Sequence, residues 1–404
     1  MATPPSLVVR AIAALRSRVP GQSWWIGRTG AVLLVSAVVS MAPPALAPGA
    51  EATIAVPAWI DAAGRSDVTR QLRQFVASVP DGATVRFGRR ARYRIDGTLE
   101  LSGRRDLTLE GNGATLFAGT HGGPDRAEVR LIGGSHWTIR DLTIVGADSV
   151  PGQFEPQYQW QHGIDLRGVE GALIENVAIR NVLGDDVYVG LSTDSASRWS
   201  RDVSIINSRG VGSGRMAIAI TAGRDVLVRG GVWSNPGLST FDLEPNDASG
   251  GAAWVVIQDA TIGTGTRGSV LTVAGGGPVS DVFLQDNHLI GRPLTVLVDQ
   301  GARRPRDIHV HGNISTVSFA GPGPAAMVFR NTDGVSISAN RQPLAQGGAV
   351  GLLATLDSTH VRVTDQEPYL GLTSDAPASY TYLILGAAAS IYLIAVYKTW
   401  QMRR

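Results

Sequence analysis

Short stretches in which two apolar residues flank one residue of any kind recur through the middle of the chain, and most are closely followed by Gly, Asp or Asn. Alternation with a period of two predicts β-strands with one buried face, and the small residues predict the turns that end them. From Val203 onward the stretches begin at intervals of 23 to 29 residues. A repeat of this length predicts a solenoid, whose units bury their apolar faces only by stacking. Clear examples begin at Leu107, Trp137, Val203, Val226, Val255, Val282, Ile308 and Val335.

The repeat favours an all-β fold, a right-handed, single-stranded parallel β-helix. It is rich in β-branched residues at period two, and Gly and Asn stand at the corners. Because asparagine tolerates left-handed backbone angles, we expect asparagines at one corner to hydrogen-bond along the stack as a ladder. The leucine-rich repeat is the competing solenoid, but its leucine spacing is absent here.

An amphipathic segment that opens at Ser66-Asp67 predicts a helix capping the first coil. Its apolar face comprises Val68, Leu72, Phe75, Val76 and Val79. The helix, the stretch PDGATVRF and the stretch YRIDGTLEL together resemble the opening of pectate-lyase-like (pectin lyase-like) β-helix proteins. That superfamily contains polysaccharide lyases, polygalacturonases and alginate epimerases, and the resemblance covers roughly residues 58–365. It implies the fold and a polysaccharide substrate, and leaves the reaction open.

Both ends of the chain carry hydrophobic segments. Residues 31–42 are apolar and follow an arginine-bearing leader, which indicates a signal sequence or an uncleaved anchor within residues 1–50. Residues 380–397 are uncharged, flanked by tyrosines and followed by basic residues, which predicts a C-terminal transmembrane helix within residues 379–404. The positive flanks place both termini in the cytoplasm if the first segment is uncleaved. The β-helix domain, residues 51–378, is then extracytoplasmic at the cell membrane.

Charge and composition narrow the chemistry. The terminal segments carry seven basic residues and no acid, so the middle is acidic although the whole chain has a net charge of +2. An acidic domain lacks the basic stripe that nucleic acid requires, and we expect no nucleic-acid partner. The chain has no cysteine, which excludes disulfides and thiolate chemistry. Lys398 is the sole lysine, so the ectodomain has no lysine to serve as a base.

Acidic residues gather in four consecutive repeats between residues 160 and 247. Alternation places Asp165, Asp186, Tyr188, Asp242 and Glu244 on the outward face of the third strand, with Thr272 and Thr295 continuing the column. Asp185 and Arg215 lie at strand entrances. Neighbouring carboxyls raise one another's proton affinity, which can hold an acid protonated beside an ionised base. We therefore expect the catalytic residues among Asp165, Asp185, Asp186, Tyr188, Arg215, Asp242 and Glu244.

The stretch GDDVYVG also resembles the Gly-Asp-Asp motif of polygalacturonases, which implies that Asp185 and Asp186 form an acid and base pair. Where that family has Gly-His-Gly, this chain has Gly214-Arg215-Met216, so hydrolysis of polygalacturonate is not implied. A lyase or epimerase is the alternative, with Tyr188, His162 or Arg215 removing a proton. In that case Asp185, Asp186, Asp242 and Glu244 would hold Ca²⁺ through oxygen ligands.

An insertion between residues 145 and 162 carries aromatic and amide side chains. Aromatic rings pack on the C–H faces of sugars while amides bond their hydroxyls. The predicted substrate-binding residues are His162, Phe154, Tyr158, Trp160 and Asn246.

Taken together, the sequence predicts a membrane-anchored, extracytoplasmic enzyme acting on envelope polysaccharide, with uronate-containing chains among the candidates. The alternatives are a non-catalytic glycan-binding or scaffolding module and an assembly factor in a membrane complex. Under them, Asp185 and Asp186 cap a corner and Arg215 is an ion-pair partner.

Overall fold

The computed structural model describes residues 52–192, 198–265, 268–299, 303–319, 325–343, 351–365 and 372–373. All of them belong to the second of two units into which the chain divides, Met1–Glu51 and Ala52–Arg404. The hydrophobic segments 31–42 and 380–397 lie outside these ranges. Within the ranges, no helix has the length and apolar character needed to cross a membrane.

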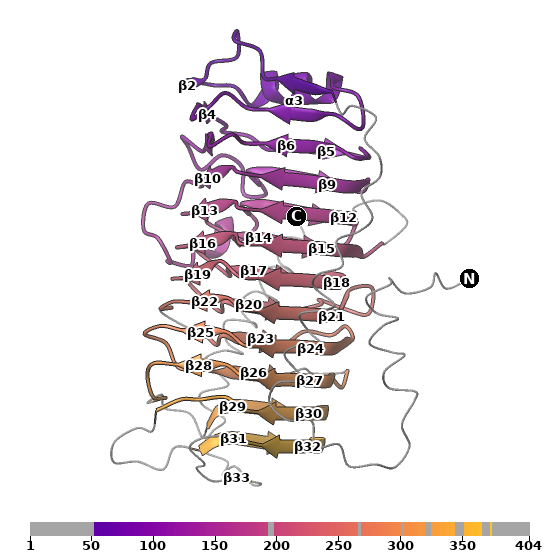
Figure 1. The fold of residues 1–404 in the computed structure, drawn as a ribbon, viewed down its shortest axis with the longest axis vertical. Helices are drawn as coiled ribbons and strands as arrows, with labels where there is room; N and C mark the ends of the chain where they lie inside the picture. Colours follow the sequence, from indigo (N-terminus) through magenta and orange to yellow (C-terminus); the bar gives the residue numbers. More distant parts are fainter. Residues whose placement is uncertain are drawn as a thin grey trace, which may run out of the picture. The chain divides into compact units, whose positions relative to one another are not determined.

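The second unit is a right-handed parallel β-helix built from three sheets (Figure 1). A complete coil contributes one strand to sheet A, the next to sheet B and the third to sheet C, and these strands pair in parallel with their counterparts in neighbouring coils. Among the described residues, the first coil has no strand in sheet C and the last two have none in sheet B. The predicted all-β solenoid is confirmed.

Sheet A contains β1 (Thr53–Ala55), β3 (Thr84–Arg86), β6 (Thr108–Glu110), β9 (Ser135–Arg140), β12 (Glu170–Glu175), β15 (Ser200–Ile206), β18 (Ala222–Arg229), β21 (Gly251–Gln258), β24 (Val279–Gln285), β27 (Arg306–His311), β30 (Asp333–Ser338) and β32 (Thr359–Thr364). Sheet B contains β2 (Ala63–Asp67), β4 (Arg92–Arg94), β7 (Thr115–Phe117), β10 (Thr143–Val145), β13 (Ala178–Arg180), β16 (Arg209–Val211), β19 (Val232–Ser234), β22 (Thr261–Ile262), β25 (His288–Leu289) and β28 (Ile314–Ser315). Sheet C contains β5 (Leu99–Ser102), β8 (Val129–Ile132), β11 (Ile164–Arg167), β14 (Val187–Gly190), β17 (Ile218–Ile220), β20 (Phe241–Leu243), β23 (Leu271–Val273), β26 (Val296–Asp299), β29 (Ala325–Arg330), β31 (Gly351–Leu356) and β33 (Leu372–Thr373).

Alternation along each strand sends apolar side chains into the interior, where they stack in columns. In sheet B the inward column runs Leu116, Ile144, Ile179, Gly210, Trp233, Ile262 and Leu289. All of these except the glycine are buried hydrophobic residues of one continuous core. Burying an aliphatic side chain contributes roughly 1.5–3 kcal/mol, so Gly210 is a costly gap in the column unless something else fills it.

The predicted asparagine ladder lies inside the corner between sheets A and B. Asn287 Nδ2 donates to Asn313 Oδ1 at 2.9 Å, and Asn313 Nδ2 donates to Asn340 Oδ1 at 2.8 Å. All three residues are fully buried. Because each amide also bonds backbone groups of neighbouring coils, the ladder joins these coils without leaving buried polar atoms unpaired.

The N-terminal end is capped by helix α3 (Thr69–Ser78), with Leu72 and Val76 buried against the core. The predicted cap is confirmed, although the helix begins two residues after Asp67. Asp67 Oδ1 accepts hydrogen bonds from the backbone N–H and the hydroxyl of Thr69. This satisfies one of the N–H groups left open at a helix start.

Candidate functional site

A column of outward-facing residues runs along sheet C from coil to coil, as alternation predicted. Strand pairing places in it, in order, Asp165, Tyr188, Ala219, Asp242, Thr272 and Leu297. The predicted end of the column is wrong, because Leu297 occupies the position that we expected for Thr295. Strand β26 begins only at Val296, so Thr295 belongs to the preceding corner. The polar part of the column therefore ends at Thr272.

Beside this column, the buried side chain of Arg215 joins three acids. Nη1 donates to Asp185 Oδ2 at 2.9 Å and Nη2 donates to Glu244 Oε2 at 2.8 Å. Nη2 also lies 3.9 Å from Asp242 Oδ2. Asp185 comes from the coil before that of Arg215, and the other two acids from the coil after it. The guanidinium thus holds three coils together at one point, which we call the Arg215 cluster.

The pKa values of two acids of the Arg215 cluster are shifted in opposite directions. Burial disfavours the charge of Asp185, but Arg215 and the Met216 N–H, 3.0 Å from Oδ1, outweigh it and hold the pKa of Asp185 below its ordinary value. For Asp242, burial and the nearby Glu244 raise the pKa well above its ordinary value despite Arg215. The surroundings therefore favour the ionised form of Asp185 and the protonated form of Asp242.

The structure separates the two acids of the Gly-Asp-Asp stretch. Asp185 faces Arg215, whereas the carboxyl of Asp186 lies in the interior beside Gly210. The outward orientation predicted for Asp186 is wrong, because this residue precedes β14 and strand alternation does not extend into the corner. Burial and then the charge of Asp185 raise the pKa of Asp186 well above its ordinary value. An acid and base pair of Asp185 and Asp186 on one face is thus not formed.

Asp165 belongs to a different ion-pair network at the other side of Tyr188. Arg130 Nε donates to Asp165 Oδ2 at 2.7 Å, and Arg167 Nε donates to its Oδ1 at 3.0 Å. Asp165 is fully buried, and Tyr188 and Ala219 stand between it and Asp242 in the column. It is therefore not brought together with the Arg215 cluster.

His162 links the cluster to Tyr188. Its Nδ1 accepts a hydrogen bond from the backbone N–H of Asp185 at 3.1 Å and lies 3.2 Å from Asp185 Oδ2. Its ring stacks on that of Tyr188, with centroids 4.6 Å apart and an interplanar angle of 8°. The hydroxyl of Tyr188 is 2.7 Å from that of Thr221. His162 is fully buried, so it positions these groups and does not line an open surface.

The insertion, residues 146–163, packs along the corner between sheets B and C. Its backbone lies close to glycines of later coils, since a Cβ at Gly214 would be 2.9 Å from Gln153 O and one at Gly237 would be 3.0 Å from Gly152 O. Short 3₁₀ helix η1 (Pro156–Tyr158) lies in the insertion. The insertion packs closely against these glycines because they have no side chains to hold it away.

The three aromatic residues predicted on this loop, Phe154, Tyr158 and Trp160, are half-buried. Trp160 meets His162 edge to face at 6.2 Å, whereas Tyr158 packs on His121 at 4.9 Å. Trp160 is therefore linked to the Arg215 cluster through His162, whereas the ring contact of Tyr158 is with His121. Asn246 is exposed, two residues beyond Glu244.

The predicted calcium ligands do not form a metal site. Within the described ranges, no group of three or more His, Cys, Asp or Glu residues is arranged to hold a metal ion. Asp185, Asp242 and Glu244 surround the guanidinium of Arg215 instead, and Asp186 points away from them. The cation that these acids bind is supplied by the chain itself.

Sequence reasoning missed Arg130, Thr221 and Gly210. Arg130 pairs directly with Asp165 across adjacent strands, and its place between Val129 and Leu131 in β8 carries the same alternation signal that identified Asp165. The role of Gly210 has no such signal, because it depends on which way Asp186 turns.

The chain was compared with known proteins. No protein-family model matches the sequence, and a search of curated proteins gave no match. Among solved structures, it is similar to a family 28 exopolygalacturonase from Yersinia enterocolitica, with a TM-score of 0.50 and 12% identity over 81% of this chain and 79% of that chain. It is also similar to the A-module of the mannuronan C-5 epimerase AlgE4 from Azotobacter vinelandii, with a TM-score of 0.46 and 14% identity over 78% of this chain and 97% of that one.

A third likeness is to the catalytic unit of a GH87 alpha-1,3-glucanase from Streptomyces thermodiastaticus, with a TM-score of 0.39 and 13% identity over 83% of this chain and 69% of that one. At such low identity, the likeness to the exopolygalacturonase shows the fold alone. The chain has the pectin lyase-like parallel β-helix fold that the opening of its sequence predicted.

Proposed function

We propose that the chain is a polysaccharide-active enzyme that hydrolyses glycosidic bonds on the outward face of sheet C. One observation carries the proposal: Arg215 binds neighbouring carboxyl groups whose pKa values are shifted in opposite directions, that of Asp185 downward and that of Asp242 upward. Glycoside hydrolysis requires such a division, with one carboxyl donating a proton and another acting as a base or nucleophile.

The proposed roles follow from protonation and exposure. Asp242 donates its proton to the glycosidic oxygen as the C–O bond to the sugar breaks. Glu244, the most exposed acid of the cluster at 13%, either removes a proton from the water that bonds to the sugar carbon, or itself bonds to that carbon to form an ester that water then hydrolyses. Arg215 fixes the Glu244 carboxylate through Nη2, and Asp185 balances the charge of Arg215 through Nη1.

Two features favour hydrolysis over β-elimination or epimerisation of a uronate. Those reactions need a cation to neutralise the substrate carboxylate and a group to remove the C5 proton. Of the arginines near the column, Arg130, Arg167 and Arg215 all bind acids of the chain. Burial raises the pKa of Tyr188, which makes its phenol a weaker acid and its phenolate scarce at neutral pH. A neutral polysaccharide therefore fits this face better than a uronate.

A non-catalytic glycan-binding module is the second candidate. It is favoured by the completeness of the ion pairs and by the burial of Arg215 and Asp242, with exposed fractions of 3% and 2%. In this case the cluster stabilises the stack, and sugars bind to Trp160, Tyr158 and Phe154 without turnover.

We further propose that the β-helix domain works outside the cytoplasmic membrane, held there by one or both terminal segments. The support is the sequence alone, namely the uncharged stretch 380–397 with its basic flank and the leader before residue 50. Protease digestion tests this. Protease added outside the intact cytoplasmic membrane should cleave the β-helix domain, and a domain that is cleaved only after that membrane is broken contradicts the proposal.

The activity is tested by incubating the full chain with a panel of neutral and uronate polysaccharides and measuring both new reducing ends and the ultraviolet absorbance of unsaturated uronates. We expect reducing ends without that absorbance. Asp242→Asn is expected to lower the rate by about 100-fold or more, and Glu244→Gln likewise, whereas Asp259→Asn, at a corner of sheets A and B, is the matched control. Unsaturated product would establish a lyase instead, and binding without turnover would establish the glycan-binding module.

A further inference from the structure

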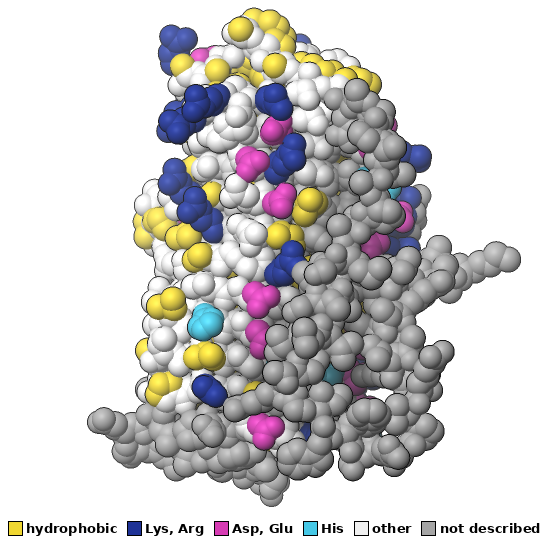
Figure 2. All heavy atoms as spheres, viewed as in Figure 1, with side chains coloured by type: hydrophobic (Ala, Val, Ile, Leu, Met, Phe, Trp, Pro, Cys, Tyr) yellow, Lys and Arg dark blue, Asp and Glu magenta, His cyan; other side chains and the backbone are white. Residues whose placement is uncertain are grey.

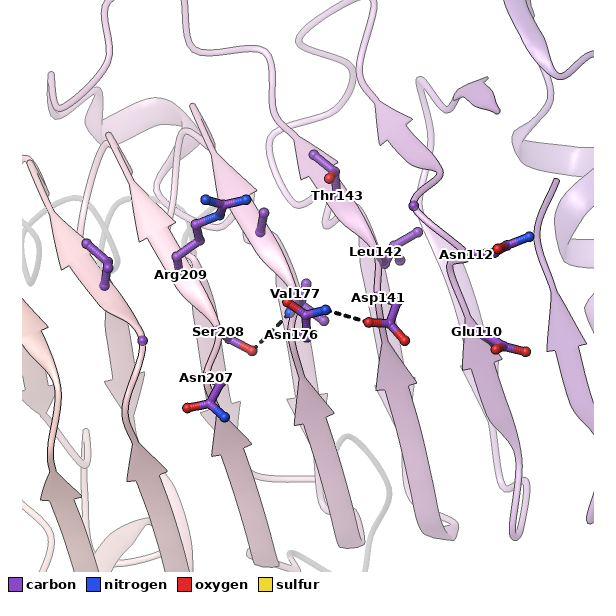
Figure 3. A pocket seen from close by; sticks show the side chains of 14 residues that line it. Glu110, Asn112, Asp141, Leu142, Thr143, Asn176, Val177, Asn207, Ser208 and Arg209 are labelled. Carbon is purple, nitrogen blue, oxygen red and sulfur yellow. Dashed lines mark hydrogen bonds between the residues drawn. The ribbon is translucent and has the colours of Figure 1, made fainter. Parts of the chain in front are cut away.

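A groove lies on the corner between sheets A and B, and no residue of a sheet C strand lines it. Figure 3 shows the side chains that line it. Its volume is about 610 Å³. It is lined by residues of consecutive coils, from Glu110 and Asn112 at one end to Gly231 and Val232 at the other. No residue of the Arg215 cluster contributes to it. In Figure 2 acidic side chains lie down the middle of the face, along the line between sheets B and A, with basic side chains between some of them.

The polar side chains of the groove repeat with the coils. Asp141, Asn176 and Asn207 each follow directly after a strand of sheet A, in consecutive coils. Each has a positive φ, of 53°, 52° and 48° respectively. Coils in a parallel stack are about 4.8 Å apart, so a row of amide and carboxyl groups lies along the groove at this spacing.

The backbone does not require these side chains. The N–H groups of Asn176 and Asn207 donate to carbonyls of the next coil, Ile206 O at 3.1 Å and Arg229 O at 2.9 Å. The same corner position is occupied by Gly230 in the next coil and by Gly312 further along. The position therefore demands only a residue that tolerates a positive φ. The amides of Asn176 and Asn207 are exposed. Asn176 Nδ2 donates one hydrogen bond to Asp141 Oδ1, which leaves its second N–H and its carbonyl oxygen to a ligand.

Further along the stack, the corner has a different arrangement. There the asparagines Asn287, Asn313 and Asn340 lie one residue deeper and are buried in hydrogen bonds to the chain itself. In the groove that deeper position is held in one coil by Ser208, whose hydroxyl accepts from Val177 N–H at 3.1 Å. The exposed row and the buried ladder are thus distinct sets of residues, and the structural role belongs to the buried set.

We infer that the groove binds a stretch of neutral polysaccharide lying along the stack, as a second carbohydrate site separate from sheet C. Sugar hydroxyls donate and accept hydrogen bonds, which matches amide groups that do both and carboxylates that accept. The charged side chains that line the groove are Glu110, Asp141 and Arg209. The acids outnumber the arginine, which favours a neutral ligand over an anionic one. Val232, 40% exposed, offers an apolar patch for a sugar C–H face.

This inference shares with the proposed function only the assumption that the ligand is a polysaccharide, so its test separates the two. The full chain and its variants are run through gels that contain soluble neutral glucans, mannans or galactans, and retardation gives the affinity. The variant Asn176→Gly/Asn207→Gly removes both amides while keeping residues suited to a positive φ. The control Asp259→Gly/Asp286→Gly also replaces two polar side chains by glycine at the same corner outside the groove, where both residues have positive φ. It removes carboxylates where the groove variant removes amides.

We expect the groove variant to bind the retarding polysaccharide about tenfold more weakly, and the control variant to bind as the wild type. Hydrolysis of short oligosaccharides, which cannot reach from sheet C to the groove, should be unchanged in the groove variant. Unchanged retardation, an equal loss in the control, or no retardation of the wild type by any of the glycans would overturn the inference. Retardation that depends on the groove, with no turnover of any glycan, would uphold this inference and refute the proposed activity.

Discussion

The carboxyl of Asp186 fills the place of the side chain that Gly210 lacks. A Cβ at residue 210 would lie 2.1 Å from Asp186 Oδ2 and 2.9 Å from Trp233 Cε3. Gly210→Ala is therefore expected to lower the free energy of unfolding by about 1–3 kcal/mol through overpacking. In an Asp186→Ala background the same substitution should cost much less, because the space is then open. Urea unfolding of the two single variants and the double variant measures this coupling, and an equal cost in both backgrounds would contradict the packing.

Arg215 stabilises the fold most where Asp185 is ionised. Because the folded-state pKa of Asp185 lies below its ordinary value of 3.8, its contribution to stability is present above that value and is lost as the pH falls through the folded pKa. Arg215→Gln leaves the buried acids without their cation and should destabilise the chain by about 3–5 kcal/mol at neutral pH.

That deficit should shrink as the solution is acidified, because the orphaned acids then bind protons. Unfolding free energies of wild type and Arg215→Gln across the acidic range test the trend. A deficit that is constant with pH would show that the loss arises from packing of the arginine side chain and not from its charge.

Glu128 predicts a pH dependence of the opposite sign. Arg126 Nη1 donates to Glu128 Oε1 at 2.6 Å, but burial outweighs this pairing and raises the pKa of Glu128 from 4.5 to about 8. In that window the folded state holds a proton that the unfolded state has released, so the stability from this residue falls as pH rises from 4.5 to about 8. Glu128→Gln keeps the accepting oxygen and cannot titrate. Its unfolding free energy should fall less steeply over the window than that of the wild type, and parallel curves would refute the assignment.

The asparagine ladder predicts a graded loss of stability. Asn313 Oδ1 accepts from both Asn287 N and Asn287 Nδ2, while Asn313 Nδ2 donates to Leu284 O and Asn340 Oδ1. Asn313→Ala leaves several buried groups unpaired and should cost about 3 kcal/mol or more. Asn207→Ala, at an exposed position of the same corner, should cost less than half as much. Thermal or urea unfolding of both variants compares them, and equal losses would mean that the buried bonds add little.

The coil architecture could be predicted from sequence because its signal is local and repeated. Alternation fixes which residues of a strand face the core, and it placed Asp165, Tyr188 and Asp242 in one column correctly. The signal fails at corners, where the backbone turns between strands. Asp186 lies one residue before a strand and turns inward, and Thr295 lies one residue before another and leaves the column. The groove has no sequence motif beyond Asp141, Asn176 and Asn207, whose spacing of 35 and 31 residues differs because the insertion and corner lengths differ.

The partners of each acid were also beyond prediction. Whether Asp185 meets Arg215 or a metal depends on the side-chain paths across three coils, which residue spacing does not encode. From the sequence, Arg215 could be predicted as either an ion-pair partner or a catalytic group. The structure assigns it to the centre of the cluster, so that a cationic side chain stands where a bound cation was expected.

The parallel stack has a consequence for how such a molecule can change over evolutionary time. Each coil bonds only to the coil before it and the coil after it, and the residues of the Arg215 cluster all lie between His162 and Glu244. Coils could therefore be gained or lost near the C-terminal end without altering a single contact of the cluster. The reach of the protein along a polymer and the chemistry at its site are set by different parts of the chain, and selection can adjust one while leaving the other untouched.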